Sequence, residues 1–332
     1  MRSLLFLTEG GAGVGLGHIR RCLTLATALT KFGLASEFRV AGGDAAESIV
    51  ARAGFGVAPI ASTSSVAEVA RAVQASSATG VVIDSYAATE EVFRATGMAT
   101  IVMDDLADRR LPVDIVINPA ISALRLGYDR LTDAHLLLGP QYALLRPEFA
   151  TAARTVRSVI SRILITLGGG DHGSLVSDVA RWCATVAPEA TIEVVIGPFS
   201  DRSRIDETER VIILNQPDIP EAMIRADLAV ASGGQTLFEL AATGLPAITV
   251  ATAGNQAQNL ADFAAAGTIR SAGGRIDAHL EAQFVAAFDE LRSADVRREM
   301  SARGPCLVDG RGAERVASSM VTLLRESRSA IG

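Results

Sequence analysis

Ala231-Ser-Gly-Gly-Gln-Thr-Leu-Phe-Glu239 is the stretch of the chain that decides its fold. A short apolar strand, predicted over about 227–231, runs into two glycines, and a helix is predicted to begin at about Gln235. A strand that turns through glycines into a helix is the repeating unit of α/β folds. Gly233 and Gly234 let backbone N–H groups approach a ligand, and a helix N-terminus favours an anion such as phosphate.

Glu239 lies one turn inside this helix, too deep to cap it. A carboxylate in this place can accept hydrogen bonds from a sugar diol, as acidic residues do for ribose in dinucleotide folds. The alternative is a tight strand-to-helix turn followed by a solvated glutamate. Two linked segments, Gly244-Leu-Pro246 and Gly254-Asn-Gln256, favour the nucleotide interpretation.

Length and composition limit the architecture. A chain of 332 residues exceeds the size at which one core usually keeps growing, so two domains are expected. Its composition, 49% hydrophobic but only 5% aromatic, suits buried parallel strands packed by helices. A net charge of -6 without a basic cluster argues against nucleic-acid binding.

Cysteine usage and the N-terminus indicate the compartment. Cys22, Cys183 and Cys306 lack CxxC spacing, so neither a disulfide framework nor a zinc site is predicted. The apolar run Leu4–Leu7 is too short for a signal peptide, and no run of about 18 apolar residues occurs elsewhere. We therefore expect a cytoplasmic protein without membrane insertion.

Strand and helix patterns alternate along the whole chain, which predicts right-handed βαβ units and parallel sheets. Strands are predicted at 4–7, 37–40, 81–83, 100–103, 115–117, 162–166, 192–196, 211–214, 228–231 and 247–250. Helices are predicted near 18–31, 45–53, 65–76, 89–96, 175–186, 219–226, 235–243 and 255–266.

The pattern restarts after a break at about 146–160, so we expect two Rossmann-like domains. Residues 1–150 form the predicted sugar and nucleophile side, and residues 151–332 the predicted nucleotide-binding domain. The last helix, about 312–326, is expected to pack back on the first domain. In such folds ligands bind beyond the carboxyl ends of the strands, so the two sheets are expected to face a central cleft.

The first predicted strand ends in Glu9-Gly-Gly-Ala-Gly-Val-Gly-Leu-Gly-His18. Gly15 and Gly17 belong to this close-approach loop, and His18 stands where the next helix begins. An imidazole titrates near neutrality and can take a proton from water or a hydroxyl, although a capping or packing histidine is the alternative. The glycine spacing is not a clean G-x-G-x-x-G and no P-loop occurs, so no cofactor is predicted.

Two further segments carry polar groups at predicted strand ends. Thr166-Leu-Gly-Gly-Gly-Asp171 offers backbone donors at Gly168 and Gly169 for a diphosphate, while Asp171 either contributes to this site or caps the next helix. Asp104-Asp105-x-x-Asp108-Arg109 places carboxylates that can grip a sugar, order the cleft or remain solvated. No D-x-D and no His/Cys cluster occurs, so no metal site is predicted.

Four segments together resemble the UDP-sugar hydrolases of pseudaminic acid biosynthesis, which act on UDP-2,4-diacetamido-2,4,6-trideoxy-β-L-altropyranose and have the α/β GT-B fold. These segments are Gly17-His-Ile-Arg-Arg-Cys-Leu-Thr-Leu-Ala26, Met103-Asp-Asp-Leu-Ala-Asp-Arg109, Leu138-Gly-Pro-Gln-Tyr-Ala-Leu-Leu-Arg-Pro-Glu-Phe149 and the block 231–259. The C-terminal half, including Val308-Asp-Gly-Arg-Gly-Ala-Glu-Arg315, is also similar to the GT-B transferase that adds GlcNAc to lipid I.

The resemblance implies an inverting, metal-independent hydrolysis in which His18 activates water and UDP leaves. The resemblance implies that Glu239 binds the ribose of the nucleotide. The other implied substrate and nucleotide contacts are Gly15, Gly17, Arg21, Gly168, Gly169, Asp171, Ser232, Gly233, Gly234, Gln235, Thr236, Asn255, Gln256 and Asn259. The implied partners are a UDP-sugar and UDP. A nucleoside diphosphate is already a good leaving group, so backbone dipoles can stabilise its charge without a protonating acid.

The chain departs from the family pattern at three places in the first domain: Thr8-Glu9, Asp84-Ser85-Tyr86 and Asn118-Pro-Ala120. A glycosyltransferase would use the same base and nucleotide site with an acceptor hydroxyl in place of water. A catalytically silent nucleotide-sugar binder is a further alternative. The exact sugar, the choice of UDP or CDP, and the oligomeric state stay open at this point.

Overall fold

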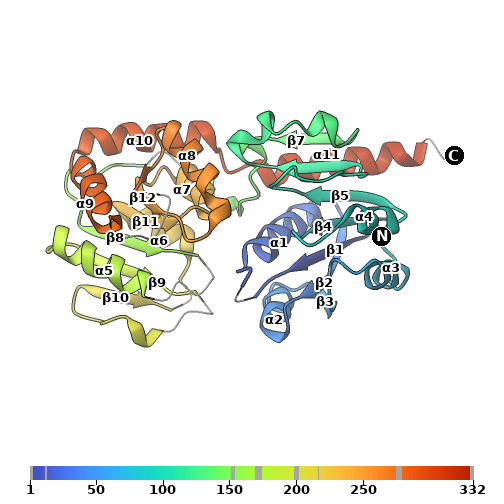
Figure 1. Cartoon of the computed structure of the whole chain (residues 1–332), viewed down its shortest axis with the longest axis horizontal. Coiled ribbons are helices and arrows are strands. Elements are labelled where there is room, and N and C mark those ends of the chain that lie inside the picture. Colours follow the sequence, from blue (N-terminus) through green and yellow to red (C-terminus); the bar gives the residue numbers. More distant parts are fainter. Residues whose placement is uncertain are drawn as a thin grey trace. The chain divides into compact units, whose positions relative to one another are not determined.

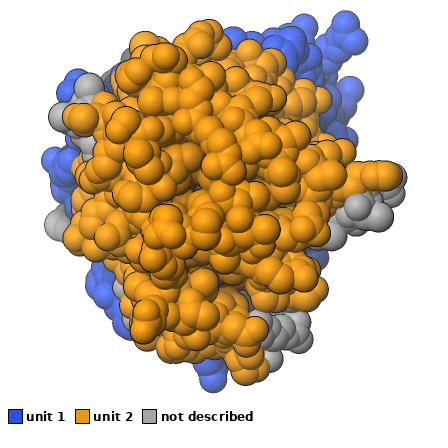
Figure 2. All heavy atoms as spheres, turned by 90° about the vertical axis from the view of Figure 1, so that its left-hand side faces the viewer, with its two compact units in different colours: residues 1–145, 311–332 blue, residues 146–310 orange. Residues whose placement is uncertain are grey.

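A computed structural model describes residues 3–11, 13–150, 154–168, 174–197, 202–215, 217–273 and 279–329. The chain divides into two compact units, which Figure 2 distinguishes by colour. Unit 1 comprises Met1–Leu145 and Arg311–Gly332, and unit 2 comprises Arg146–Gly310. None of the helices in the described part of the chain combines the length and apolar character needed to cross a bilayer.

Unit 1 is built on a sheet whose strands pair in the order β3-β2-β1-β4-β5-β6-β7, every pairing parallel (Figure 1). The strands are β1 Ser3–Glu9, β2 Ala35–Ala41, β3 Gly56–Pro59, β4 Gly80–Asp84, β5 Ala99–Met103, β6 Ile115–Asn118 and β7 His135–Leu138. The helices are α1 Gly17–Thr30, α2 Asp44–Arg52, α3 Val66–Gln74, α4 Glu90–Ala95 and α11 Gly312–Ser329, and short 3₁₀ turns cover Ile121–Arg125, Tyr128–Arg130 and Pro140–Tyr142.

Helices cover both faces of this sheet. Leu5 and Leu7 of β1 pack in one apolar cluster with Phe93 of α4. Leu4 points to the opposite face, because side chains alternate along a strand. There Leu4 and Leu324 of α11 both lie next to the position that a Cβ on Gly80 would take. Burial on both faces explains why the central strands read as nearly continuous apolar runs.

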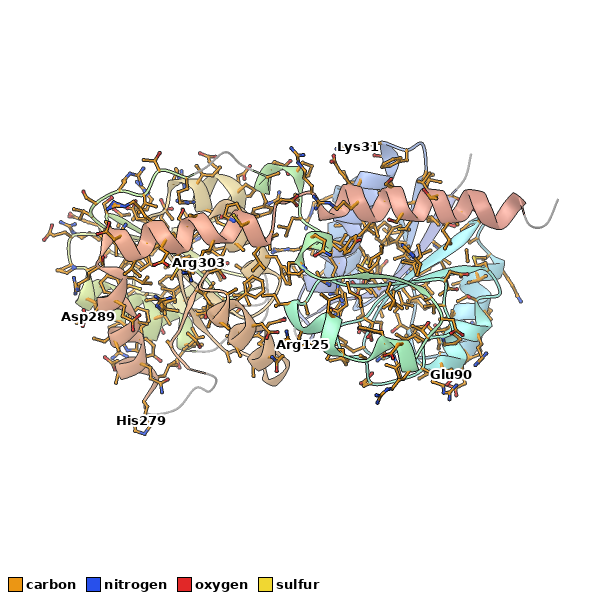
Figure 3. The ribbon with its side chains drawn as sticks, turned by 90° about the horizontal axis from the view of Figure 1, so that it is seen from above. Lys31, Glu90, Arg125, His279, Asp289 and Arg303 are labelled. Atoms are coloured by element: carbon orange, nitrogen blue, oxygen red, sulfur yellow. The ribbon has the colours of Figure 1, made fainter. Side chains whose placement is uncertain are left out.

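The C-terminal helix α11 belongs to unit 1, as predicted from its sequence. Gly312 lies so close to the backbone of Ala143 that a Cβ would clash, and α11 contacts α1 directly. At the surface of this pair, Lys31 Nζ lies 2.9 Å from Glu314 Oε1; Lys31 is labelled in Figure 3. The sequence analysis expected the second domain to cover residues 151–332. In the structure unit 2 begins at Arg146 and ends at Gly310, so both bounds differ.

Unit 2 repeats the architecture with strands in the order β10-β9-β8-β11-β12-β13, again all parallel. The strands are β8 Arg162–Thr166, β9 Thr191–Val195, β10 Val211–Leu214, β11 Leu228–Ser232, β12 Ala247–Val250 and β13 Arg270–Ser271. The helices are α5 Leu175–Val186, α6 Ile219–Arg225, α7 Thr236–Thr243, α8 Ala257–Ala265, α9 Leu280–Leu291 and α10 Ala294–Leu307, with 3₁₀ turns at Pro147–Phe149, Arg202–Arg204 and Gly254–Gln256.

A buried arginine ties helices α9 and α10 of unit 2 to the segment that precedes β8. Arg297 of α10 is fully buried and donates hydrogen bonds of 2.8–2.9 Å to the backbone carbonyls of Leu291, Arg157 and Ser158. Because three carbonyl oxygens accept from the guanidinium, the charged group is satisfied without a carboxylate in direct contact. Helices α9 and α10 did not figure among the helices predicted from the sequence.

The strands that the sequence did not predict lie at the edges of the sheets. β3 contains Gly56 and ends at Pro59, and proline is tolerated at an edge because it cannot donate to a ladder. β7 is four residues long and β13 only two. Short edge strands lack the long apolar runs that identify central strands from sequence.

Candidate active site and nucleotide loop

The carboxyl ends of β1 and β4 form the topological switch point of unit 1. From β1 the chain adds β2 and β3 on one side of the sheet, and β4 then starts the other side. Ligands of parallel α/β sheets bind at such points. His18 lies in the first turn of α1, directly after the loop that leaves β1. Asp84 is the last residue of β4. The strand order therefore brings together two side chains that are 66 residues apart in the chain.

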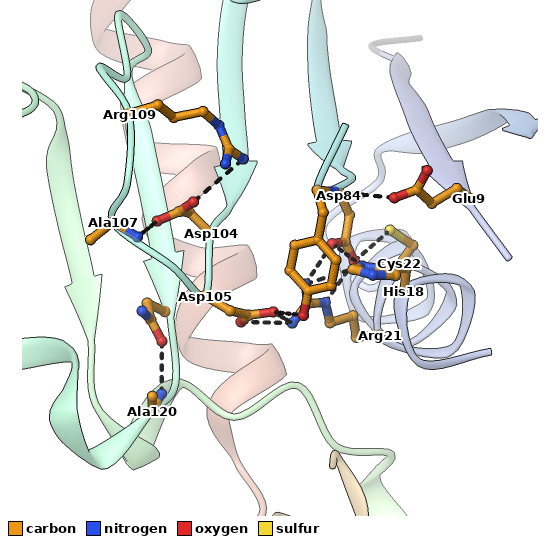
Figure 4. Close-up of polar contacts among 12 residues, drawn as sticks. Glu9, His18, Arg21, Cys22, Asp84, Asp104, Asp105, Ala107, Arg109 and Ala120 are labelled. Atoms are coloured by element: carbon orange, nitrogen blue, oxygen red, sulfur yellow. Dashed lines mark hydrogen bonds and ion pairs between the residues drawn. The ribbon is translucent and has the colours of Figure 1, made fainter. Parts of the chain in front are cut away.

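His18 and Asp84 form a buried pair (Figure 4). His18 Nδ1 lies 2.6 Å from Asp84 Oδ1, and the side chains are 6% and 0% exposed. Burial raises the pKa of Asp84, but the charges of Arg21 and His18 and their hydrogen bonds outweigh it and hold this pKa well below its usual range. An ionised carboxylate can only accept, so Nδ1 carries a proton, and in the neutral imidazole Nε2 is then the acceptor.

Arg21 holds the carboxylate of this pair from the other side. Its Nε donates to Asp84 Oδ2 and its Nη2 to Asp84 Oδ1, both at 2.6 Å. Its Nη1 lies 2.9 Å from both oxygens of Asp105. Burial lowers the pKa of Arg21, but the carboxylates of Asp105 and Asp84 more than offset this effect and raise it. The sequence analysis assigned Arg21 to substrate or nucleotide contact, whereas the structure turns all three nitrogens toward carboxylates.

Tyr86 covers one side of His18. The two rings meet edge to face, with centroids 4.7 Å apart and an interplanar angle of 82°. The Tyr86 hydroxyl donates to Asp105 Oδ2 at 3.0 Å, and its backbone N–H donates to Glu9 Oε1 at 3.1 Å. Burial and the nearby Asp105 raise the pKa of Tyr86 above its usual range, so the hydroxyl stays a donor. Tyr86 thereby links the ends of β1, β4 and β5 around the imidazole.

Asp84 and Tyr86 are the residues of this site to which the sequence analysis gave no role. Both stood out only as part of Asp84-Ser85-Tyr86, a departure from the family pattern. The available signal was an acidic residue that ends a fully apolar strand, Gly80–Asp84. A carboxylate at the carboxyl end of a buried parallel strand needs a partner, and the helix after the first strand offers the basic side chains of His18, Arg20 and Arg21.

Asp104 belongs to a separate polar cluster at the ends of β5 and β6. It accepts from the Tyr128 hydroxyl at 2.6 Å and from the Ala107 N–H at 2.8 Å, and Arg109 lies 3.5 Å away. The Tyr128 hydroxyl accepts in turn from Asn118 Nδ2 at 2.8 Å. These contacts tie the loops after β5 and β6 together, so of the neighbouring carboxylates Asp104 and Asp105 only Asp105 reaches the histidine site.

The glycine loop after β1 is closed by its own backbone. Gly11 and Gly15 exchange two backbone hydrogen bonds of 3.0 and 2.6 Å, and Gly15 has a φ of +79°, which favours glycine. Gly17 is the first residue of α1, and no atom lies within 4 Å of the place its Cβ would take. Nothing lies within 4 Å of the corresponding position on Gly15 either, so both glycines leave open space around the start of α1.

In unit 2 the corresponding switch point lies between β8 and β11. Gly168 follows β8 with a φ of +99°. Gly169 and Asp171 lie outside the described residues. After β11, Ser232 ends the strand, Gln235 is the N-cap position of α7, and Thr236 is its first residue. Glu239 lies in the first turn of α7, half-buried.

The two glycines after β11 differ in surroundings. A Cβ on Gly233 would meet Gln256 and Leu260 at 2.8 Å, so this glycine is needed for packing on α8. Nothing lies within 4 Å of the corresponding position on Gly234. Gly234 is therefore the one of the two that leaves room for a ligand at the N-terminus of α7.

Gln256 is engaged within the protein. Its Oε1 accepts from the Gly233 N–H at 3.1 Å, the Thr252 N–H at 2.9 Å and Thr252 Oγ1 at 3.2 Å. The sequence analysis assigned Gln256 to ligand contact, whereas here it braces two loops. Asn259 lies on α8, half-buried. The side chain of Asn255 lies outside the described residues.

Metal ligands do not cluster in the parts of the chain described. Among those residues, no group of three or more His, Cys, Asp or Glu side chains is arranged to hold a metal ion.

Curated proteins with related sequences match part of the chain. No protein-family model matches the chain. It is 24% identical over 268 residues to an uncharacterized protein of Methanocaldococcus jannaschii, a match covering 74% of this chain and 55% of that protein. It is 26% identical over 223 residues to the spore coat polysaccharide biosynthesis protein SpsG of Bacillus subtilis, covering 64% and 66% of the two chains. The chain thus spans between about half and two thirds of the length of these curated relatives.

Solved structures show the fold. Acinetobacter baumannii MurG superimposes with a TM-score of 0.66 at 14% identity, covering 97% of this chain and 100% of that chain. The calicheamicin glycosyltransferase CalG4 gives 0.68 at 15% identity with 98% of both chains covered. MnaA from S. aureus, solved with UDP, gives 0.67 at 11% identity, covering 98% and 97%. The chain has the GT-B fold of two Rossmann-like, parallel-sheet domains.

Proposed function

We propose that the protein hydrolyses a UDP-linked deoxyamino sugar to the free sugar and UDP, in the biosynthesis of a nonulosonic acid or a surface polysaccharide. The observation that carries the proposal is the buried His18–Asp84 pair, which leaves His18 Nε2 as an acceptor at the switch point of unit 1. An imidazole fixed through Nδ1 by a carboxylate is the usual arrangement of a general base.

The proposed reaction is a single displacement. His18 Nε2 takes a proton from water while the water oxygen bonds to the anomeric carbon from the face opposite UDP. The bond between that carbon and the diphosphate oxygen breaks, and its electron pair leaves with UDP, so the sugar is released with inverted configuration. Asp84 stabilises the imidazolium that forms, and the proton then passes to solvent.

The nucleotide is assigned to unit 2. The support is the loop from Ser232 to Thr236, where Gly234 leaves room at the N-terminus of α7, and the half-buried Glu239 in the first turn of the same helix. Helix N-termini favour phosphate, and a carboxylate suits a ribose diol. UDP in the structure of MnaA and the naming of SpsG for polysaccharide biosynthesis support this assignment from outside the chain.

An inverting glycosyltransferase is the second candidate, favoured by the likeness of the fold to CalG4. The base would be the same, and an acceptor hydroxyl would replace water. A catalytically silent binder is disfavoured, because it has no use for a buried and oriented imidazole.

The test is nucleotide release from a panel of UDP- and CDP-linked deoxyamino sugars without acceptor, run in oxygen-18 water. We expect the label in the sugar and none in the nucleotide, with the inverted anomer appearing first by proton NMR. Label in UDP, or a retained anomer before mutarotation, would refute the mechanism. Transfer to an added acceptor in preference to water would establish the glycosyltransferase instead.

A further inference from the structure

Arg21 uses its whole guanidinium within unit 1. Two of its nitrogens bond Asp84 and the third bonds both oxygens of Asp105, while only 10% of the side chain is exposed. A bidentate arginine–carboxylate pair fixes the plane as well as the position of the carboxylate. Asp84 Oδ1, which Arg21 Nη2 bonds, is the same oxygen that accepts from His18 Nδ1.

The outer end of Arg21 is fixed in turn. Asp105 accepts from Arg21 Nη1 and, through Oδ2, from the Tyr86 hydroxyl. Tyr86 is held at its backbone by Glu9. A continuous set of contacts therefore runs from the end of β5 through Arg21 to the imidazole on α1.

We propose that Arg21 is a positioning residue: by holding Asp84 in plane and ionised, it fixes His18 with the proton on Nδ1 and Nε2 ready to accept. This inference rests on the proposed function for its catalytic meaning. It replaces the role of nucleotide contact with one exerted chiefly through Asp84 Oδ1, which both Arg21 Nη2 and His18 Nδ1 contact; Arg21 Nη2 also lies 3.3 Å from His18 Nδ1.

The charge balance gives the direction of the expected pH effect. The titratable and charged groups that face the His18–Asp84 pair are Arg21, Asp105, Tyr86, Cys22 and Glu9. Tyr86 and Cys22 stay neutral, because burial raises the pKa of both. Arg21 is thus the one cation in this set, apart from the imidazolium itself. Without the charge of Arg21, the His18–Asp84 pair retains its proton to higher pH. The acid limb of the pH–rate profile therefore shifts to higher pH.

The experiment compares Arg21→Met with Arg20→Met, which changes an exposed arginine one position earlier on α1. Nitrogen-15 NMR of the imidazoles reports the tautomer of His18, assigned by the signal lost in His18→Ala. We expect Arg20→Met to match the wild type. Arg21→Met should give mixed tautomers, an acid limb shifted to higher pH and a kcat lowered about 10- to 100-fold, with KM and UDP affinity unchanged.

A wild-type tautomer and pH profile in Arg21→Met would overturn the inference, as would lost UDP affinity with an unaltered His18 signal. If that variant fails to fold, Arg21→Lys carries the test. The lysine ammonium keeps the charge but cannot make the paired hydrogen bonds of the planar guanidinium, so an intermediate loss of kcat is expected. Unchanged kcat with an unchanged His18 tautomer would refute the positioning role. The NMR measurement needs no substrate, so it tests the positioning role separately from the reaction. If the His18 signal shifts in Arg21→Met but the wild-type protein hydrolyses no UDP-linked sugar, only the proposed function is refuted.

Discussion

Replacing Asp84 by asparagine tests the pair at the centre of unit 1. The carboxylate now accepts three short hydrogen bonds, one from His18 Nδ1 and two from Arg21. An amide has one oxygen and one NH₂ group, so at least one donor of Arg21 must face another donor. If the NH₂ group faces His18, the imidazole must move its proton to Nε2 and can no longer act as a base.

The size of the effect follows from these two orientations. Losing one charge-assisted hydrogen bond of about 1.5–3 kcal/mol from the transition state lowers turnover roughly 10- to 150-fold. A switch of tautomer as well would extend the loss to about 10⁴-fold, the value known for the triad of serine proteases. Breaking a buried ion pair on one side costs about 3–5 kcal/mol of stability, and we expect the lower end because Asp105 still pairs with Arg21.

The stability loss should depend on pH. The pKa of Asp84 is lowered in the folded protein, so the pair contributes its full stability above the unfolded value of about 3.9 and loses it as pH falls through the folded value. The gap in unfolding free energy between wild type and Asp84→Asn should therefore be present at neutral pH and narrow in strong acid.

Denaturant unfolding at several pH values and nucleotide release at neutral pH measure the two effects. Asp289→Asn is the matched control, because Asp289 pairs with Arg292 on the surface of unit 2 with 60% of its side chain exposed; it is labelled in Figure 3. An exposed pair is worth about 0–1 kcal/mol, so this control should resemble the wild type. Turnover of Asp84→Asn within about threefold of wild type, well under the smallest expected loss, would refute the orienting role of Asp84.

Two further predictions concern the base and the nucleotide site. His18→Ala should lower turnover roughly 100-fold or more while UDP affinity, measured by calorimetry, stays nearly unchanged, because the base acts only on the nucleophile. Wild-type turnover in this variant would remove His18 from the mechanism. Glu239→Ala should weaken UDP and substrate binding together by roughly 10- to 150-fold, because a charge-assisted bond to ribose is made equally in the ground and transition states. UDP binding that is unaltered by the change would defeat the ribose assignment.

The positions of several strands and helices could be predicted from local pattern. β8, β10, β12 and α5 have the bounds expected from the sequence, and β1 and α1 extend or shift the predicted ranges by one or two residues. Each of these elements is identified by the period of its own apolar residues and by flanking glycines, so no distant contact is needed to specify it. The same local signal placed His18 where a helix follows the first strand.

The partners of that histidine required the tertiary structure. Asp84 and Asp105 reach α1 because β4 lies beside β1 and β5 beside β4, and the order of strands in a sheet leaves no periodic trace in the sequence. For the same reason Arg21 could be recognised as a cation near a glycine loop but not as the residue that grips two carboxylates. The sequence by itself determined the α/β alternation and the candidate base, because those depend on neighbouring residues. The folded sheet decided which carboxylate orients the base, because that depends on strands brought together from distant parts of the chain.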